Sequence, residues 1–491
     1  MMDVISEFVR EQKRYTKSDL RRIFKLPADY AYVFIKELKA FGVLKAVKND
    51  SAQRDMSDLV DEDIHVVDVE TENDDNLYVF VYVGIVTVNN RIIKCYPKYV
   101  LSETDLLGEM KQVIKVISRY GSKEQIINLY NGDVENSQFN ILAVILFLIR
   151  DFYESGVYNN SEDIIEDNGE GEIIWDKTIN EGFSIINNNR PYYMDLYTRK
   201  TVDDDFDFFK RIHECVLTKC SKLLEESDLL DIFDIAAIEL SEAVLDDFGD
   251  IDYILYRLQA ELSIQFNTRK QILLKTLYAY IANSRILEDS YGLSMYGTNS
   301  FNLVWEKVCS EVFSNKLNTP IGQIGLPDHL HNAYEPHTRL IDVIEKPKWS
   351  GIREDGSIFD KEVKDTLIPD IINISQQEGI CQFTILDAKY YNIQLAEEKQ
   401  LRGQPGVGDV TKQYLYQLAY KDFLSNYQIT EVKNCFLLPT QSSEIVKTGV
   451  VSMNILSSLE LENIQIRQLP ARVIYDYYLT GRTMDVSDLQ L

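Results

Sequence analysis

The chain has 491 residues, enough for two to four domains, and its apolar content is ordinary for a globular protein. Its 51 basic and 78 acidic residues give a formal net charge of −27, which opposes unaided binding to a DNA backbone. Since no apolar run is long enough to cross a bilayer and the N-terminus is too charged for a signal peptide, we expect no membrane partner and a cytoplasmic location.

Residues 1–46 predict a small helical module with the pattern of a winged helix. Thr16 is suited to cap a first helix, apolar residues recur at helical spacing in a second, and a strand is expected from Gly42. Several basic residues leave two interpretations open, contact with DNA or a structural or docking module. Residues 47–76 are acidic and predict a poorly ordered connection.

Residues 77–200 predict an α/β region, to which we assign docking of a partner. Residues 77–100 have the pattern of a β-hairpin that turns at Asn89-Asn90. Helical patterning follows from Glu103 to Tyr120 and from Gln138 to Tyr153.

Residues 201–295 predict a helical region, and residues 296–491 predict the domain that carries the chemistry. In the helical region the apolar spacing favours helices over 232–245, 252–262 and 268–287, and a further helix is expected over 300–317. Beyond it we expect three antiparallel strands at 339–345, 367–375 and 382–390. A helix at 410–424, after a glycine-rich loop, and a fourth strand at 432–438 are expected to follow.

The segment from Thr366 to Tyr391 holds the most informative pattern in the chain. Asp370 follows a proline in one apolar run, and Asp387 and Lys389 end the next. Side chains two apart in a strand share a face, so Asp387 and Lys389 point together, and a turn near Gly379 would bring Asp370 beside them. Two carboxylates can hold Mg²⁺ or Mn²⁺, and a lysine can stabilise negative charge during phosphodiester hydrolysis. The alternative is an ordinary sheet with charges at its edge.

Two further residues are candidates for catalysis, each with a plainer alternative. Glu306, on the predicted preceding helix, could orient a metal or a water, or could be an exposed helix charge. Gln413, on the predicted helix after the Asp-x-Lys strand, could hold a water or a backbone phosphate, or could serve a contact between sheet and helix.

The spacing of Asp370, Asp387 and Lys389 resembles the PD-(D/E)xK motif of restriction-endonuclease-like nucleases. The expected order of helix, three strands, helix and strand is that of the same nuclease core. The predicted fold class is therefore α+β and multidomain, with a possible winged helix in an N-terminal α/β region, a helical middle and a C-terminal PD-(D/E)xK core.

Four segments together resemble the LlaJI-type restriction endonuclease subunit, a family similar to the McrC nuclease subunit of McrBC systems. They are GEGEIIWDKTIN, the hairpin ending KCYPKYV, FNLVWEKV, and PDI with ILDAKYY. The resemblance implies a Mg²⁺-dependent endonuclease for DNA in phage defence, which acts with a McrB-like AAA+ GTPase and in a system that could include a methyltransferase. It gives the catalytic positions to Asp370, Asp387 and Lys389. A nuclease that acts alone in repair or recombination, and a non-catalytic DNA-binding scaffold, remain open.

Overall fold

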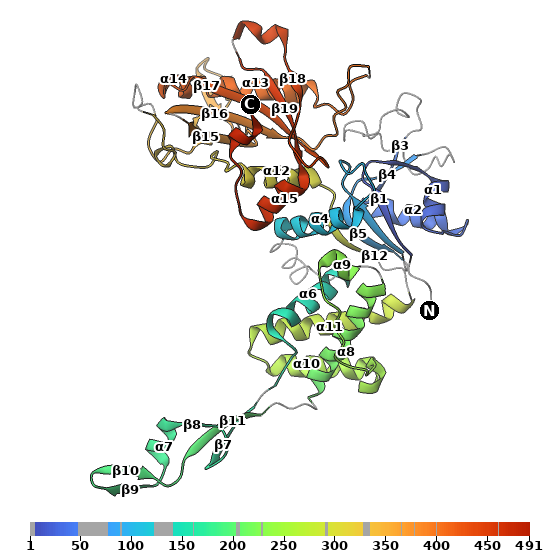
Figure 1. Cartoon of the computed structure of the whole chain (residues 1–491), viewed down its shortest axis with the longest axis vertical. Coiled ribbons are helices and arrows are strands. Elements are labelled where there is room, and N and C mark those ends of the chain that lie inside the picture. The colour runs from blue at the N-terminus through green and yellow to red at the C-terminus, as the bar shows by residue number, and fades with distance from the viewer. Residues whose placement is uncertain are drawn as a thin grey trace. The chain divides into compact units, whose positions relative to one another are not determined.

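We describe the protein from a computed structural model, which covers residues 5–47, 77–88, 91–121, 141–160, 162–202, 207–226, 229–289, 293–327, 334–364, 366–377, 379–398, 400–459 and 461–491. The chain divides into two compact units (Figure 1), one made of Met1–Gly132 with Tyr296–Leu491 and the other of Asp133–Met295. The acidic connection predicted for residues 47–76 lies, apart from Val47, outside the described residues. No helix in the described part of the chain has the length and apolar character needed to cross a bilayer.

Near its N-terminus the first unit contains the two helices and the strand that the sequence predicts, preceded by two short strands that it does not predict. Helix α1 (Lys17–Ile23) starts at Thr16, whose side chain accepts from Asp19 N while the Asp19 carboxylate accepts from Thr16 N, both at 3.0 Å. Helix α2 (Tyr30–Ala40) buries Phe34 and Leu38. Strands β2 (Arg14–Thr16), β4 (Leu77–Phe80) and β3 (Leu44–Val47) form an antiparallel sheet in that order.

A second sheet of the first unit contains the predicted hairpin from Val83 onward, whereas its predicted first residues, Leu77–Phe80, form β4 of the other sheet. Strands β5 (Val83–Val88) and β6 (Arg91–Tyr96) are antiparallel, β1 (Ile5–Arg10) runs parallel to β6, and β12 (Leu293–Thr298) completes the order β1-β6-β5-β12. The predicted turn at Asn89-Asn90 lies outside the described residues. A Cβ on Gly84 would lie 2.3 Å from Tyr296 O, so only glycine permits this approach of β12.

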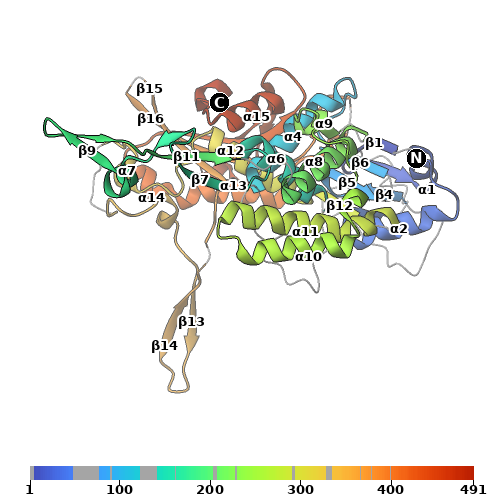
Figure 2. The same ribbon diagram turned by 90° about the horizontal axis from the view of Figure 1, so that it is seen from below.

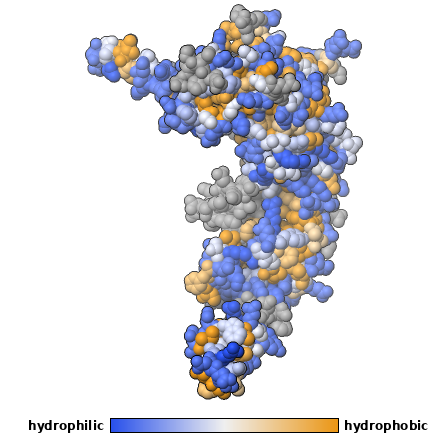
Figure 3. Space-filling model, turned by 60° about the vertical axis from the view of Figure 1, so that its left-hand side comes forward, coloured by the Kyte–Doolittle hydropathy of each residue, from blue (hydrophilic) through white to orange (hydrophobic). Residues whose placement is uncertain are grey.

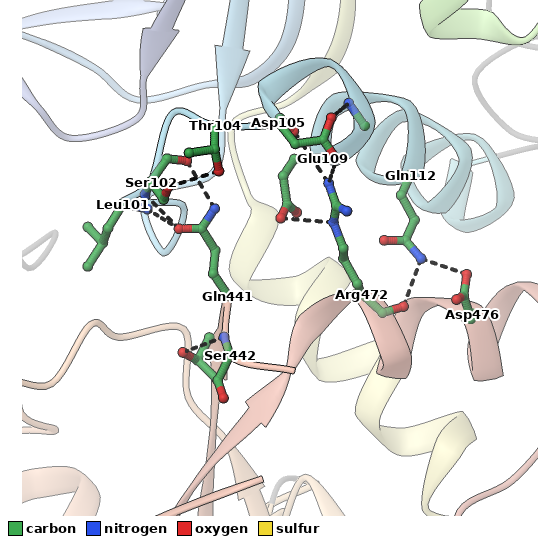
Figure 4. A network of polar contacts seen from close by, with 12 residues as sticks. Leu101, Ser102, Thr104, Asp105, Glu109, Gln112, Gln441, Ser442, Arg472 and Asp476 are labelled. Atoms are coloured by element: carbon green, nitrogen blue, oxygen red, sulfur yellow. Dashed lines mark hydrogen bonds and ion pairs between the residues drawn. The ribbon is translucent and has the colours of Figure 1, made fainter. Parts of the chain in front are cut away.

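The polar network shown in Figure 4 joins helix α4 (Leu106–Gly121) to the C-terminal helix α15 (Ala471–Thr480). Arg472 on α15 pairs with Asp105 (2.5 Å) and with the buried carboxylate of Glu109 (3.0 Å). Gln441 Oε1 accepts from Leu101 N at 2.7 Å, which ties the segment before α4 to the C-terminal part of the unit. These contacts hold two segments that are far apart in the sequence in one unit.

The second unit contains the helical region. Its helices include α6 (Ile141–Ser155), α8 (Phe208–Glu226), α9 (Leu229–Phe233), α10 (Ile251–Ile264) and α11 (Thr268–Asp289), with a 3-10 turn at η2 (Leu245–Phe248). The predictions for α6, α10 and α11 are confirmed.

The helix predicted over 232–245 is wrong, because side chains of α8 bind the backbone there. Ile238 N donates to Ser221 Oγ at 2.8 Å, and Leu240 N donates to Thr218 Oγ1 at 3.1 Å. These amides are satisfied by hydroxyl groups of a neighbouring helix, so the segment needs no helical carbonyls of its own.

A β-rich segment extends from the same unit, and we call residues 162–202 the arm (Figure 1). It contains a three-stranded sheet, a short helix and a hairpin: β7 (Glu162–Asp167), β11 (Tyr197–Val202) and β8 (Glu172–Ile173), then α7 (Trp175–Glu181), then β9 (Ser184–Asn187) with β10 (Arg190–Tyr193). Many of its large apolar side chains are exposed, including Phe183 and Ile186.

A five-stranded sheet forms the centre of the C-terminal part of the first unit. Strands β15 (Ile371–Gln377) and β16 (Ile380–Ala388) form an antiparallel hairpin, and β17 (Glu431–Thr440) and β19 (Ile464–Pro470) follow in parallel. Strand β18 (Val446–Val451) completes the order β15-β16-β17-β19-β18.

Helices cover the two faces of this sheet. On one side α12 (Phe301–Val312) places the buried Trp305 against Tyr475 of α15, and Trp305 Nε1 donates to Leu437 O at 3.1 Å. On the other side α13 (Val407–Ala419) and α14 (Lys421–Asn426) pack Tyr420 and Phe423 against Phe383 of β16. The predicted helix 410–424 is therefore two consecutive helices.

The strand predicted at 339–345 is wrong, because this segment forms the 3-10 turn η4 (Leu340–Val343). Arg339 pairs with Asp342 at 2.7 Å, three residues later, which favours a turn over an extended chain. A hairpin that the sequence analysis missed follows it, made of β13 (Lys348–Ile352) and β14 (Ile358–Glu362), and it projects from its unit in Figure 2.

Candidate active site

The β15–β16 hairpin places the two predicted carboxylates side by side. Ile371 pairs with Leu386, so the same register sets Asp370 opposite Asp387 at the end of the ladder. Asp370 Oδ2 accepts a hydrogen bond of 2.9 Å from Ala388 N, the residue after Asp387. After β16 ends, the chain still runs beside β17, and Lys389 N donates to Leu437 O of β17 at 2.9 Å. The structure therefore brings Asp370, Asp387 and Lys389 to one end of adjacent strands.

Lys389 is held by two carboxylates. Its Nζ lies 2.9 Å from Asp387 Oδ2 and 3.1 Å from Asp409 Oδ1. Asp409 sits in the first turn of α13 and also accepts from Gly406 N at 3.1 Å, where the helix begins. One carboxylate thus caps α13 and fixes the ammonium group, so the position of Lys389 depends on the start of this helix.

The site concentrates carboxyl groups away from water. Burial, followed by the charges of Asp387 and Glu306, raises the pKa of Asp370 to about 8. Burial also raises the pKa of Asp387, although the neighbouring Lys389 opposes the rise, and a hydrogen bond links this carboxyl group to that of Asp370. Burial and the neighbouring carboxyl groups therefore make this pair hold a proton more tightly than ordinary carboxyl groups do.

Burial and neighbouring charges also shift the pKa values of Glu306 and Lys389. Burial and then the charge of Asp387 raise the pKa of Glu306, which places this α12 residue within the electrostatic reach of the pair. Burial alone would lower the pKa of Lys389, but the carboxylates of Asp387 and Asp409 raise it above its ordinary value. Lys389 therefore remains a cation, and its charge is available to a bound anion.

Gln413 lies beneath the site, on the buried side of α13. Its side chain is fully buried, and its Nε2 donates to Ile385 O of β16 at 3.4 Å. Its backbone carbonyl accepts from Asn434 Nδ2 of β17, also at 3.4 Å. The amide therefore links α13 to β16 two residues before Asp387.

Sequence reasoning missed two sets of residues near Lys389. Asp409 carried a signal, because an acid three residues into a helix is typical of a cap, but its contact with Lys389 is visible only in the fold. The second set is a buried cluster behind the site, in which Tyr390, Glu11 and Lys98 share hydrogen bonds. These residues come from distant segments, and no local spacing connects them.

The comparisons with known proteins agree with the sequence resemblance. The family model described as LlaJI restriction endonuclease matches residues 82–471. A protein of Bacillus subtilis (strain 168), named "Type II restriction enzyme BsuMI component YdjA", is 27% identical over 423 residues, which cover 84% of this chain and 83% of the relative.

Two solved structures from Thermococcus gammatolerans are also similar to the chain. A half-complex of McrB AAA+ hexamers with bound McrC has a TM-score of 0.34 and 13% identity, and covers 97% of this chain and 99% of its own. The McrBC complex seen by cryo-electron microscopy has a TM-score of 0.22 and 15% identity. The match covers 56% of this chain and 79% of the chain in that complex. At these TM-scores the likeness carries no argument about fold or partner. The family model, however, spans most of the sequence, and the chain belongs to the LlaJI restriction endonuclease family.

Proposed function

We propose that this chain is the DNA-cleaving component of a restriction system that defends against phage. Membership of the LlaJI family and the name of the B. subtilis relative, a component of a restriction enzyme, support this assignment. The observation that carries it is the convergence of Asp370, Asp387 and Lys389 at one end of adjacent strands. Buried carboxyl groups with raised pKa values beside a cation are typical of a functional site.

The donor set fits a divalent cation of the Mg²⁺ or Mn²⁺ type. Among the described residues no three His, Cys, Asp or Glu side chains gather as a complete metal site. Mg²⁺ does not need one, because it is usually bound by one or two carboxylates together with waters and substrate phosphates. We assign this role to Asp370 and Asp387. A divalent ion bound there would polarise the scissile phosphate and lower the pKa of the attacking water.

The chain's own residues supply the rest of the chemistry. Lys389 offers a cation to the phosphate as negative charge grows on it, and Asp409 keeps that cation in place. Glu306, whose pKa is raised, can accept a proton or orient a water beside the carboxylate pair. Gln413 contributes by positioning, since its amide donates to the strand that carries Asp387.

We further propose that the five-stranded sheet is a PD-(D/E)xK nuclease core within residues 296–491. The order of α12, the β15–β16 hairpin, α13 and β17 supports this. For residues 1–46 we propose a winged helix, supported by two helices and by a three-stranded sheet in which β4 (Leu77–Phe80) joins β2 and β3 of this segment.

We propose that a McrB-like AAA+ GTPase delivers the DNA, and that residues 77–200 dock on it. The arm in this region exposes apolar side chains that a folded chain would normally bury, among them Trp175, Ile179, Phe183, Ile186 and Met194. Figure 3 shows apolar surface mixed with polar surface on the arm, at the lower end of the view. The net charge of −27 also supports delivery of DNA by a partner. The proposed setting is cytoplasmic, in a system that can include a methyltransferase.

The test is cleavage of plasmid DNA with Mg²⁺, by the full chain with and without a McrB-like AAA+ GTPase. Asp387→Asn should abolish cleavage and leave assembly with the subunit intact. Asp360→Asn, which removes an exposed acid, serves as the matched control and should cleave like the parent. Cutting by Asp387→Asn would refute the proposal, and cutting by the chain alone would assign it to nucleases that need no motor.

A further inference from the structure

The β13–β14 hairpin, which we call the ribbon, has two faces of different chemistry. Trp349 pairs with Lys361, and Gly351 pairs with Phe359. Side chains directly opposite each other in an antiparallel pair lie on the same face, so these residues and Arg353 share one face. We call it the Trp349 face. The opposite face carries Lys348, Ser350, Ile352, Ile358, Asp360 and Glu362.

The Trp349 face is an aromatic surface bordered by cations. A Cβ on Gly351 would lie 2.5 Å from Phe359 Cζ, so the missing side chain makes room for the phenyl ring. The Arg353 guanidinium lies 5.3 Å from the centre of that ring, and Lys361 Nζ lies 5.9 Å from it. The Trp349 side chain is 70% exposed. A large indole surface and two cations are therefore presented together.

Charge is divided between the two faces of the ribbon. Both carboxylates of its strands, Asp360 and Glu362, lie opposite the Trp349 face, and Ser350 Oγ donates to Asp360 at 2.7 Å. At the tip, Asp355 accepts from Ser357 N and Oγ at 2.9 and 2.7 Å, so this carboxylate is engaged in the turn. In a chain of net charge −27, the strand positions of this face hold cations without acids.

We propose that the Trp349 face binds DNA beside the cleavage site, an inference that rests on the proposed nuclease function. Arg353 and Lys361 match the charge of the phosphate backbone, and exposed aromatic side chains between cations are the platforms on which bases stack. The ribbon leads directly to the site, because Asp370 follows Glu362 by eight residues, at most about 28 Å of extended chain. The base of the Trp349 face, where Lys361 precedes Glu362, would lie within about one turn of duplex from the carboxylates, since one turn is roughly 34 Å.

Tryptophan fluorescence tests the contact without requiring cleavage. The chain has three tryptophans, of which Trp305 is buried and Trp175 and Trp349 are exposed. In the full chain with Asp387→Asn and Trp175→Phe, in EDTA and low salt, a 20-nucleotide single strand should quench the emission of Trp349. A 20-base-pair duplex should quench it less, because its bases are already stacked. Adding Trp349→Phe should remove the quenching, and no quenching by either DNA would overturn the proposal.

Paired charge variants test the sidedness of the ribbon. Lys361→Gln and Lys348→Gln each remove one cation, from opposite faces. By fluorescence anisotropy of the labelled single strand, Lys361→Gln should weaken binding about 3- to 10-fold and reduce the salt slope by roughly 1, whereas Lys348→Gln should leave both unchanged. Trp349→Ala should weaken binding about 10-fold. Equal effects of the two lysines, or none from Trp349→Ala, would contradict the assignment.

The two proposals can fail separately. If the complex cleaves DNA while Trp349→Ala and Lys361→Gln bind DNA like the parent, the nuclease function stands and the ribbon must face a protein instead. If the ribbon binds DNA as described but no complex cleaves, the DNA contact stands and the nuclease function fails.

Discussion

Glu11 and Tyr390, 379 positions apart in the chain, are joined by a hydrogen bond of 2.5 Å from the tyrosine hydroxyl to Glu11 Oε2. Lys98 N donates to the same oxygen at 3.1 Å, and Lys98 Nζ lies 4.7 Å from the centre of the Tyr390 ring. All three side chains are buried. Because Tyr390 directly follows Lys389, this cluster connects the end of β1 to the lysine of the candidate site.

The Glu11–Tyr390 contact should contribute measurably to stability. Tyr390→Phe leaves a buried carboxylate short of one donor, so we expect a loss of about 1–3 kcal/mol in the free energy of unfolding. A double-mutant cycle with Glu11→Gln should give a coupling energy on the order of 1 kcal/mol or more by denaturant titration. Tyr32→Phe, which alters a tyrosine that is 39% exposed, should change nothing. Additive single effects would show that the contact is not energetically significant.

Asp409 should affect the rate of cleavage through Lys389. Asp409→Asn keeps an oxygen that can cap α13 but removes one of the two charges that hold the ammonium. We expect single-turnover cleavage to slow about 10-fold, against at least about 100-fold for Lys389→Met. The exposed Asp422 of the following helix provides the control, and Asp422→Asn should cleave normally. An unchanged rate for Asp409→Asn would remove Asp409 from the site.

Arg472 should stabilise the first unit mainly through Glu109. The Glu109 side chain is 6% exposed, and that of Asp105 is 57% exposed. Arg472→Ala therefore leaves the buried Glu109 carboxylate without this partner, whereas water can solvate Asp105. We expect Arg472→Ala to cost about 1–3 kcal/mol of unfolding free energy, and Asp105→Asn less than about 1 kcal/mol. Adding Glu109→Gln to Arg472→Ala should recover part of the loss. A larger effect from Asp105→Asn would contradict this division.

The raised pKa of Asp370 predicts a pH dependence for the metal-free protein. The folded carboxyl group titrates at about 8, whereas an unfolded Asp titrates at about 4. Between these values the unfolded state has released a proton that the folded state keeps, so stability falls as the pH rises through this window. In EDTA, the parent should lose more unfolding free energy between pH 5.5 and 8 than Asp370→Asn, and Mg²⁺ should offset the loss. Identical pH slopes would refute a buried, titrating Asp370.

Local patterns predicted the parts of the structure that depend on local spacing. Thr16 predicted the cap of α1, and apolar periodicity predicted α10 and α11. The alternation in ILDAK, together with a turn at Gly379, predicted that Asp370 would meet Asp387 and Lys389. These features depend on residues a few positions apart, where backbone geometry fixes the relation.

The features that were missed depend on polar contacts that the apolar pattern does not reveal. The strand predicted at 339–345 fails because Arg339 and Asp342 close a turn, and the helix predicted at 232–245 fails because Thr218 and Ser221 bind its backbone. Neither the ion pair nor these hydrogen bonds alter the apolar pattern from which the strand and the helix were predicted. In the same way, the contact of Asp409 with Lys389 and that of Glu11 with Tyr390 require the folded sheet and helices.

The most direct test of the account is to count divalent ions bound by the carboxylate pair. Mn²⁺ titration of the full chain at pH 8, followed by the loss of the free-ion signal in electron paramagnetic resonance, measures this number. We predict that the parent binds one more ion than the variant with both Asp370→Asn and Asp387→Asn, and that Asp360→Asn binds the same number as the parent. Equal binding by the parent and the double variant would contradict a metal site at Asp370 and Asp387.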